Sequence, residues 1–179
     1  VNGGLISGGK MVKVYIGCGA GFSGDRFDAA IPVVNTLSTC EGARFLIFEV
    51  LAERTLAIAQ RLRLKDPDAG YSPYLDAYIE PILKKAKEND IRIVSNLGAA
   101  NPLGAAKRIH QLADQLGVKE LKIAIVSGDD LLGVYGAEDI KNLPTMEGIS
   151  LGEREIIAAN VYLGAQPIAE ALALDVDIV

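Results

Sequence analysis

The sequence contains no tryptophan, only one histidine and only two cysteines. Cys18 and Cys40 share no Cys-x-x-Cys spacing, which argues against a disulfide framework and a thiolate zinc site, so we expect free thiols. Cys18 reads as a small buried side chain at a strand end, with a reactive thiol as the alternative. His110 lies beside the apolar stripe of a predicted helix, which favours a structural, partly exposed histidine over a catalytic triad.

Long hydrophobic runs and basic stripes are also missing. No apolar run approaches the roughly 20 residues that a membrane helix needs, and the first residues lack the basic start of a signal peptide. The formal net charge is -5, from 18 basic and 23 acidic residues, which gives phosphate-backbone binding little support. We therefore expect a cytoplasmic protein that binds neither nucleic acid nor membrane.

The composition itself is that of an ordinary globular domain. The 179 residues are 50% hydrophobic and 23% charged, enough for one apolar core. Residues 1–10 are glycine-rich and lack periodicity, so we interpret them as a disordered lead-in or a remnant of cloning, followed by one domain over 11–179. Residues 177–179 resemble the opening of another buried strand, which suggests the amino-terminal part of a longer chain.

Hydrophobic patterning predicts alternating strands and helices. Strands are predicted at 12–17, 43–50, 91–96 and 121–127, with a weaker candidate at 160–163. Helices are predicted from near residue 25, at 56–64, at 75–87, and at 101–116, where Asn101 and Pro102 form a start signal. The order implies an α/β, Rossmann-like layered fold with a mostly parallel sheet of about five or six strands flanked by helices. Residues 129–153 read as a long excursion with only weak periodicity.

A glycine-rich loop follows the first predicted strand at residues 17–26 (GCGAGFSGDR). Its G-x-G-x-x-G spacing would let the backbone approach a phosphate, with Glu49 accepting from a ribose hydroxyl in a dinucleotide site. Asp25 weakens that interpretation because its charge would repel phosphate. A tight turn with Asp25 as a helix cap, and an anionic-substrate site of another kind, remain open. The candidate anion-binding residues here are Gly19, Gly21, Ser23, Gly24 and Arg26.

Polar residues also follow the other predicted strands. Asn96 and Asn101 could donate to a carbonyl or carboxylate, although capping alone explains Asn101. Glu49, Glu53 and Asp129 are the candidate proton-transfer residues. A surface pair with Arg54 is the alternative for Glu53, and helix capping for Asp129. We predict no metal site, because the Asp129–Asp130 pair lacks further ligands.

Five ordered blocks together resemble the acyclic terpene utilisation family, the AtuA-like proteins. They are residues 17–26, 48–55 (FEVLAERT), 96–102 (NLGAANP), 127–130 (SGDD) and 160–165 (NVYLGA). The resemblance runs from about Lys13 to the last residue and implies a role in bacterial breakdown of terpenoids such as citronellol and geraniol. In that pathway, intermediates are carried as coenzyme A thioesters. Family members are typically much longer, so a missing carboxyl-terminal region is expected.

Three hypotheses of function follow. The first is a catabolic enzyme, a lyase or hydratase, acting on a branched acyl-CoA or carboxylate, with Arg26 holding an anionic part of this small-molecule substrate. The second is a domain that binds a nucleotide or dinucleotide as cofactor. The third is a non-catalytic assembly module, a homo-oligomer for example, with the excursion as its contact surface.

Overall fold

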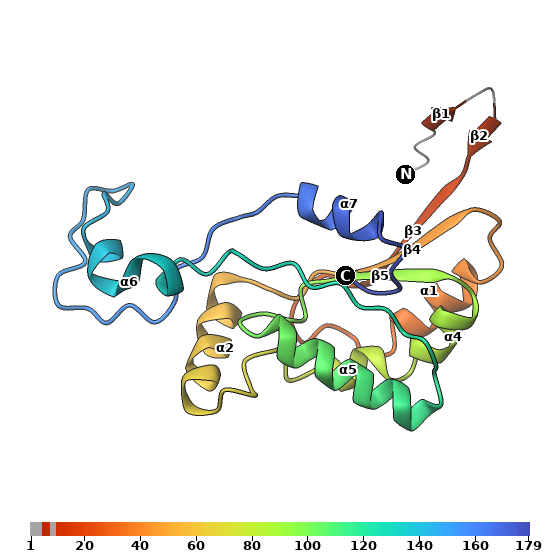
Figure 1. Cartoon of the computed structure of the whole chain (residues 1–179), viewed down its shortest axis with the longest axis horizontal. Coiled ribbons are helices and arrows are strands. Elements are labelled where there is room, and N and C mark those ends of the chain that lie inside the picture. Colours follow the sequence, from red (N-terminus) through yellow and green to blue (C-terminus); the bar gives the residue numbers. More distant parts are fainter. Residues whose placement is uncertain (1–4, 8–9) are drawn as a thin grey trace.

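The structure, a computed structural model, describes residues 5–7 and 10–179, and Figure 1 shows its mixed α/β arrangement. β1 (Leu5–Ser7) and β2 (Lys10–Val12) pair antiparallel. The expectation of a disordered lead-in falls partly on residues 1–4 and 8–9, which lie outside the described residues. Within the described part of the chain, every helix falls short of the length and apolarity that crossing a membrane requires.

The sheet is parallel and has the order β3-β4-β5. Its strands are β3 (Val14–Ala20), β4 (Ala43–Phe48) and β5 (Ile91–Ser95). Leu46 is opposite Gly17 on one side and Ile93 on the other. The first three predicted strands and their parallel pairing are confirmed. The predicted number of five or six strands is not confirmed, because the regular parallel sheet in the described residues has three.

The remaining strand candidates make only single bridges. Ile178 lies between Ile93 and Ile123 and bridges both in parallel. Val179 N donates to Ile93 O at 2.9 Å, and Ala124 N donates to Ile178 O at 2.9 Å. Residues 160–163 do not join the sheet, since Asn160 forms an antiparallel bridge with Asp130. The predicted strand at 121–127 is therefore reduced to an extended segment beside the last residues of the chain.

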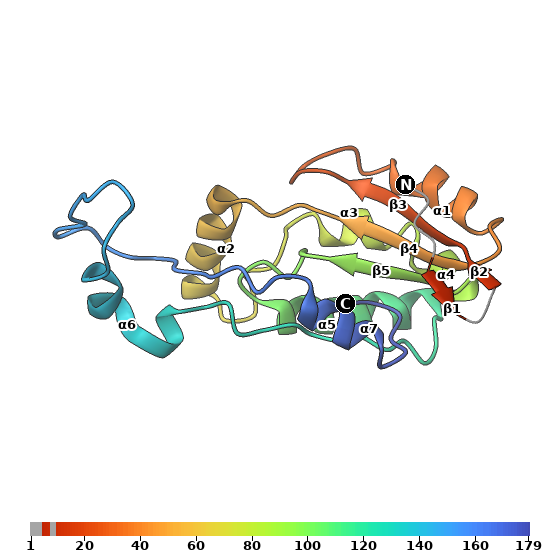
Figure 2. The same ribbon diagram turned by 90° about the horizontal axis from the view of Figure 1, so that it is seen from above.

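Helices cover one face of the sheet and leave the other largely bare. α1 (Ala30–Leu37), α4 (Leu83–Glu88) and α5 (Pro102–Leu116) lie on one side, and α7 (Gln166–Leu172) lies on the other (Figures 1 and 2). The core forms on the covered side. Its largest fully buried side chains include Tyr78, Phe48, Leu46, Ile93 and Leu112. On the bare side Cys18 is exposed, which corrects the prediction that it is buried; both cysteines are free.

Two predicted helices differ from the observed ones. The helix predicted over 75–87 is divided into α3 (Leu75–Ile79) and α4, and Pro81 lies between them. Proline lacks the amide hydrogen and clashes with the preceding turn, so it breaks the helix. The helix predicted from near Asp25 begins instead at Ala30. The helix predicted at 56–64 is confirmed within α2 (Glu53–Lys65).

The excursion projects from the domain, as Figure 1 shows for α6 (Leu132–Lys141). An antiparallel bridge between Asp130 and Asn160 closes its base, and Leu131 N donates to Ala159 O at 2.8 Å. We call residues 131–159 the arm. No side chain between residues 122 and 170 is buried, although the arm is rich in leucine, isoleucine and valine. The arm therefore adds nothing to the core of its own chain.

Candidate functional site

Glu49 and Asn96 meet at the carboxyl edge of the sheet, where β4 and β5 end side by side. Asn96 Nδ2 donates to Glu49 Oε1 at 2.8 Å, and Asn96 Oδ1 accepts from Val50 N at 2.8 Å. Leu51 N also donates to Glu49 Oε1, at 3.2 Å. These bonds fix the orientation of the Asn96 amide and leave one of its two N–H groups for a ligand. The two residues predicted from separate strand ends are thus brought together.

Asn96 also lies between two cavities that share Leu51 and Ala99. A cavity of about 470 Å³ is bounded by the end of β5, α5, α7 and the segments 123–126 and 161–164. A second cavity, of about 420 Å³, lies between α2 and residues 71–74. Ser23 and Arg54 line this second cavity, whereas Glu49 lines neither. Asn96 is thus the polar group common to both spaces.

The larger cavity is mainly apolar. Its walls include Val94, Ile109, Ile125, Leu163 and Ile168. Its polar lining comes from a few side chains, among them Ser95, Asn96 and Asp129. An apolar cavity with a few convergent polar groups is the usual form of a small-molecule site. This composition suits an aliphatic chain that carries one polar group.

Asp129 is also on the wall of the larger cavity. Its Oδ2 accepts from Asn160 Nδ2 at 2.8 Å, which fixes the carboxylate against the base of the arm. The other polar side-chain atom of Asn160, Oδ1, is buried and finds no hydrogen-bond partner among the residues that the structure describes. Asp130 lies next in the chain but outside this cavity, and its Oδ1 accepts from Leu132 N at 3.1 Å. Of the two adjacent aspartates, only Asp129 lines this cavity.

Glu53 and Arg54 begin α2 and point to different places. Tyr162 donates through its hydroxyl to Glu53 Oε1 at 3.4 Å, so Glu53 faces the segment 161–164 and does not line the cavities. Arg54 lines the 420 Å³ cavity, and within the described part of the chain its guanidinium forms no ion pair. A surface pair between Glu53 and Arg54, the alternative that the sequence left open, is therefore not formed.

The glycine-rich loop binds its own aspartate. Asp25 accepts from Gly21 N at 3.1 Å and from Arg26 N at 2.8 Å, and the Gly21 bond is the main cause of a pKa for Asp25 below its ordinary value. The carboxylate thus occupies two backbone donors that an anion would need. Asp25 does not cap α1, which starts five residues later. The backbone amides of Gly21 and Arg26 are therefore already engaged by a residue of the loop itself.

Arg26 is engaged as well. Its guanidinium donates to Asp28 through Nε at 3.0 Å and through Nη2 at 2.8 Å, and both side chains are exposed. Arg26 and Asp28 thus form a surface ion pair, and the guanidinium is not held towards a cavity. Arg54 is therefore better placed than Arg26 to meet an anionic group near Asn96.

At least one glycine of the loop is required because there is no space for a side chain at its position. A Cβ on Gly19 would lie 2.5 Å from Phe48 Cε1, inside the buried core. Gly24 has a φ of +84°, a backbone conformation that suits glycine, at the turn before Asp25. A Cβ on Gly21 would find no atom nearer than Asp25 Oδ2 at 3.9 Å. The G-x-G-x-x-G spacing thus coincides with the packing and turn requirements of this strand end.

Asn101 serves the fold. It is 8% exposed; its Oδ1 accepts from Gly104 N at 2.9 Å, and its Nδ2 donates to Pro67 O at 3.0 Å and to Ala69 O at 2.8 Å. Both hydrogens of its amide are therefore used. The capping role is confirmed, and no donor remains for a substrate carbonyl.

Comparison with known proteins agrees with the blocks found in the sequence. The family model described as Acyclic terpene utilisation family protein AtuA matches residues 14–179. The chain belongs to the AtuA family. The resemblance inferred from the five blocks is thereby confirmed, and it links the chain to acyclic terpene utilisation. Neither the curated proteins nor the solved structures include a match.

Several residues of the candidate site in this AtuA-family chain are not expected from the sequence. Thr55, Ser72 and Tyr74 line the smaller cavity, and the segments 123–126 and 161–164 form walls of the larger one. The sequence predicts both segments as sheet strands, and this prediction does not indicate that their side chains line a cavity. The block at 160–165 was the available signal, because a glycine after three apolar residues marks a chain reversal near the site.

Proposed function

We propose that the chain is an enzyme domain of acyclic terpene utilisation that binds a methyl-branched acyl thioester or carboxylate. The carrying observation is the 470 Å³ apolar cavity, whose polar lining includes Asn96 and Asp129. The branched chain would lie against Ile109, Ile125 and Leu163. Its carbonyl would face Asn96, and its anionic end would extend towards Arg54 in the adjoining cavity.

The chemistry we infer is removal of a proton beside the carbonyl, the step that lyases and hydratases of acyl thioesters share. Asp129 would take the proton from the α-carbon, and the bonding pair would move into the carbonyl to give an enolate. The second Nδ2 hydrogen of Asn96 would donate to the enolate oxygen as negative charge develops there. Glu49 would act as a positioning residue, because it holds Asn96 and lines neither cavity.

Binding of a nucleotide or dinucleotide receives less support. The amides of Gly21 and Arg26 already donate to Asp25, and the Arg26 guanidinium is paired with Asp28. A phosphate would have to displace a carboxylate from the loop. Glu49, the expected partner of a ribose hydroxyl, is held by Asn96 and Leu51 N instead.

Hydrogen exchange at the α-carbon tests this proposal directly. The chain is incubated with a methyl-branched acyl thioester in deuterated water, and loss of the α-proton signal is followed by NMR. Wild type should exchange the proton, Asp129→Asn should be about 100-fold slower or worse, and Asn96→Ala should be slower by about 100-fold or more.

Asp130→Asn is the matched control, because it makes the same change at the neighbouring carboxylate outside the cavity. It should exchange at the wild-type rate. Equal rates for wild type and Asp129→Asn, or no exchange by wild type, would contradict the proposal. A thermal shift with dinucleotide and none with acyl thioester would favour nucleotide binding.

A further inference from the structure

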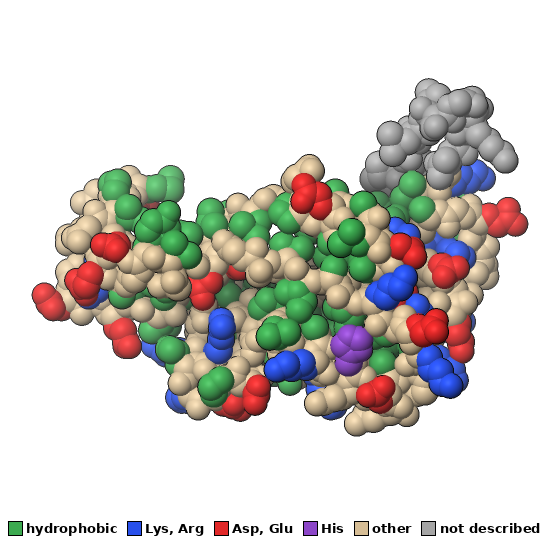
Figure 3. Space-filling model, viewed as in Figure 1, with side chains coloured by type: hydrophobic (Ala, Val, Ile, Leu, Met, Phe, Trp, Pro, Cys, Tyr) green, Lys and Arg blue, Asp and Glu red, His purple; other side chains and the backbone are tan. Residues whose placement is uncertain are grey.

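The arm presents apolar side chains to solvent. Val134 and Met146 are 75% and 101% exposed, and Tyr135, Leu143 and Ile149 are also exposed. In Figure 3, hydrophobic groups gather on the projecting end of the molecule beside acidic ones. The arm has no buried side chain in its own chain. Exposed apolar surface of this extent on such a segment indicates a contact surface.

The arm is also acidic. Its charged residues are Glu138, Asp139, Glu147, Glu153 and Glu155 against Lys141 and Arg154. Its formal charge is therefore -3, more than half of the -5 of the whole chain. A partner surface should accordingly be basic and apolar.

α2 carries such a surface. Residues 54, 58, 61, 62 and 65 recur at helical spacing and so share one face of this helix. They are Arg54, Ile58, Arg61, Leu62 and Lys65, and all five are exposed. Ile58 and Leu62 also line the 420 Å³ cavity together with Tyr71 and Tyr74. With Glu53 and Arg63 counted, the formal charge of α2 is +3, opposite to that of the arm.

The two surfaces do not cover each other within one chain. Val134 and Tyr135 on the arm are exposed, and so are Ile58 and Leu62 on α2. Yet α6 and α2 lie at the same end of the molecule in both ribbon views (Figures 1 and 2). Two-fold symmetry makes a contact between the arm of one copy and α2 of the other occur twice in a dimer, so both surfaces of both copies would be buried.

We propose that the chain forms a two-fold dimer in which the arm of each copy packs on the α2 face of the other. The apolar side chains of the arm would cover Ile58 and Leu62. Its carboxylates would approach Arg61 and Lys65. The occupant of the α2 face is thus a second copy of this chain.

Sedimentation equilibrium of charge-reversed variants tests the dimer. The arm variant is Glu138→Lys with Asp139→Lys, the helix variant is Arg61→Glu with Lys65→Glu, and a third chain carries all four changes. Wild type should be dimeric. Each two-site variant should raise the dimer dissociation constant by roughly tenfold, and the four-site variant should recover most of the loss, because its charges are again opposite.

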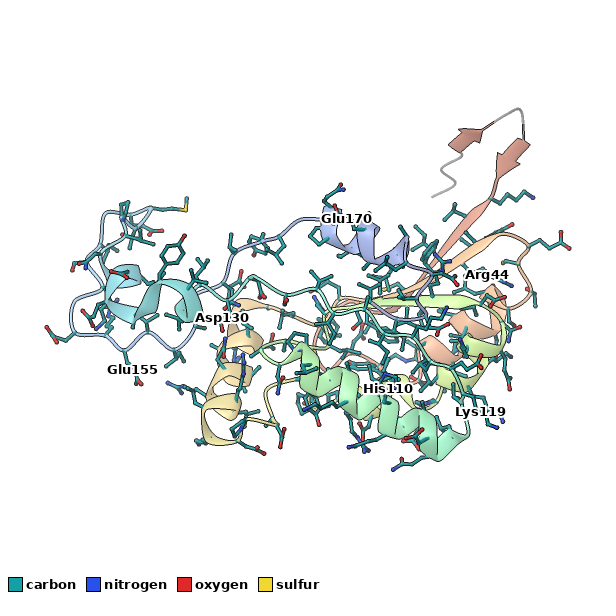
Figure 4. All side chains as sticks on the ribbon, viewed as in Figure 1. Arg44, His110, Lys119, Asp130, Glu155 and Glu170 are labelled. Atoms are coloured by element: carbon teal, nitrogen blue, oxygen red, sulfur yellow. The ribbon has the colours of Figure 1, made fainter. Side chains whose placement is uncertain are left out.

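Lys119→Glu is the control, since Lys119 is exposed at the other end of the molecule (Figure 4). It should dimerise like wild type, and circular dichroism should confirm that all variants are folded. A wild type that stays monomeric at the highest attainable concentration would overturn the proposal. Two other results would also overturn it. In the first, the arm variant dimerises more weakly but the helix variant dimerises like wild type. In the second, the four-site variant dimerises no better than the two-site variants.

Discussion

Gly19 shows how one residue couples the strand end to the core. A Cβ at this position would meet the buried ring of Phe48 at 2.5 Å, and Phe48 packs in turn on Tyr78 with ring centroids 5.6 Å apart. Gly19→Ala should therefore lower the free energy of unfolding by about 1–3 kcal/mol, the usual cost of overpacking a core. Urea denaturation measures this change. Gly21→Ala is the control and should stay near wild type, because its Cβ has open space. Equal effects of the two substitutions would contradict the packing argument.

Asp25 gives a pH-dependent prediction at the same scale. Its pKa lies below the ordinary value of 3.8, mainly because the Gly21 amide donates to the carboxylate, with the Arg26 amide second. A lowered native pKa stabilises the fold above the unfolded-state value, and that stabilisation is lost as the pH falls through the native pKa. Asp25→Ala should thus lower the Tm at neutral pH.

The Tm gap between wild type and Asp25→Ala should shrink as the pH falls below 3.8, and thermal unfolding over a pH series measures it. Asp68→Ala, at an exposed aspartate elsewhere, provides the comparison. A gap that persists undiminished in strong acid would show that the carboxylate charge is not what stabilises the loop.

At the scale of elements, α5 depends on Asn101. The side chain caps the helix through Gly104 N and also holds the carbonyls of Pro67 and Ala69. Asn101→Ala should cost about 2 kcal/mol, because it removes the cap and leaves two carbonyls of partly buried hydrogen bonds without their donor. Chemical denaturation measures the loss. Asn89→Ala, which removes an exposed bond to Lys85 O, should cost far less. Similar losses would argue against the cap as the source of stability.

Hydrophobic patterning predicts some of these elements and not others. Apolar runs predict β3, β4 and β5. The pattern is clear because these strands contribute to the core: the middle strand, β4, is paired on both sides, and its Leu46 is fully buried. The α5 stripe was equally clear, since Ile109 and Leu112 face the core. The run at 121–127 looks similar in sequence, but its partner is the short segment at 177–179, so only single bridges form. Whether such a run becomes a strand depends on the segment that pairs with it. That segment lies far away in the chain, so local patterning cannot identify it.

At the scale of the whole molecule, the parallel sheet brings together residues that the sequence placed after separate strands. Glu49 and Asn96 follow neighbouring parallel strands, which end at one edge of the sheet, and they share a 2.8 Å hydrogen bond. The roles of individual loop side chains could not be predicted from the positions of the strand ends. Asp25 turns back on its own amides, and Arg26 pairs with Asp28, because short-range geometry overrides the motif spacing. The cavity walls depend on long-range packing of segments 123–126 and 161–164.

The most direct test of the proposed function is calorimetric binding of a methyl-branched acyl thioester to two matched variants. Leu163→Asp places a charge on the wall of the 470 Å³ cavity, and Leu174→Asp makes the same change at an exposed site outside it. Leu163→Asp should raise Kd by at least about tenfold, because an unpaired charge disfavours an apolar ligand. Leu174→Asp should bind like wild type, and coenzyme A alone should bind more weakly than the thioester. Equal affinity of both variants would contradict the assignment of the cavity.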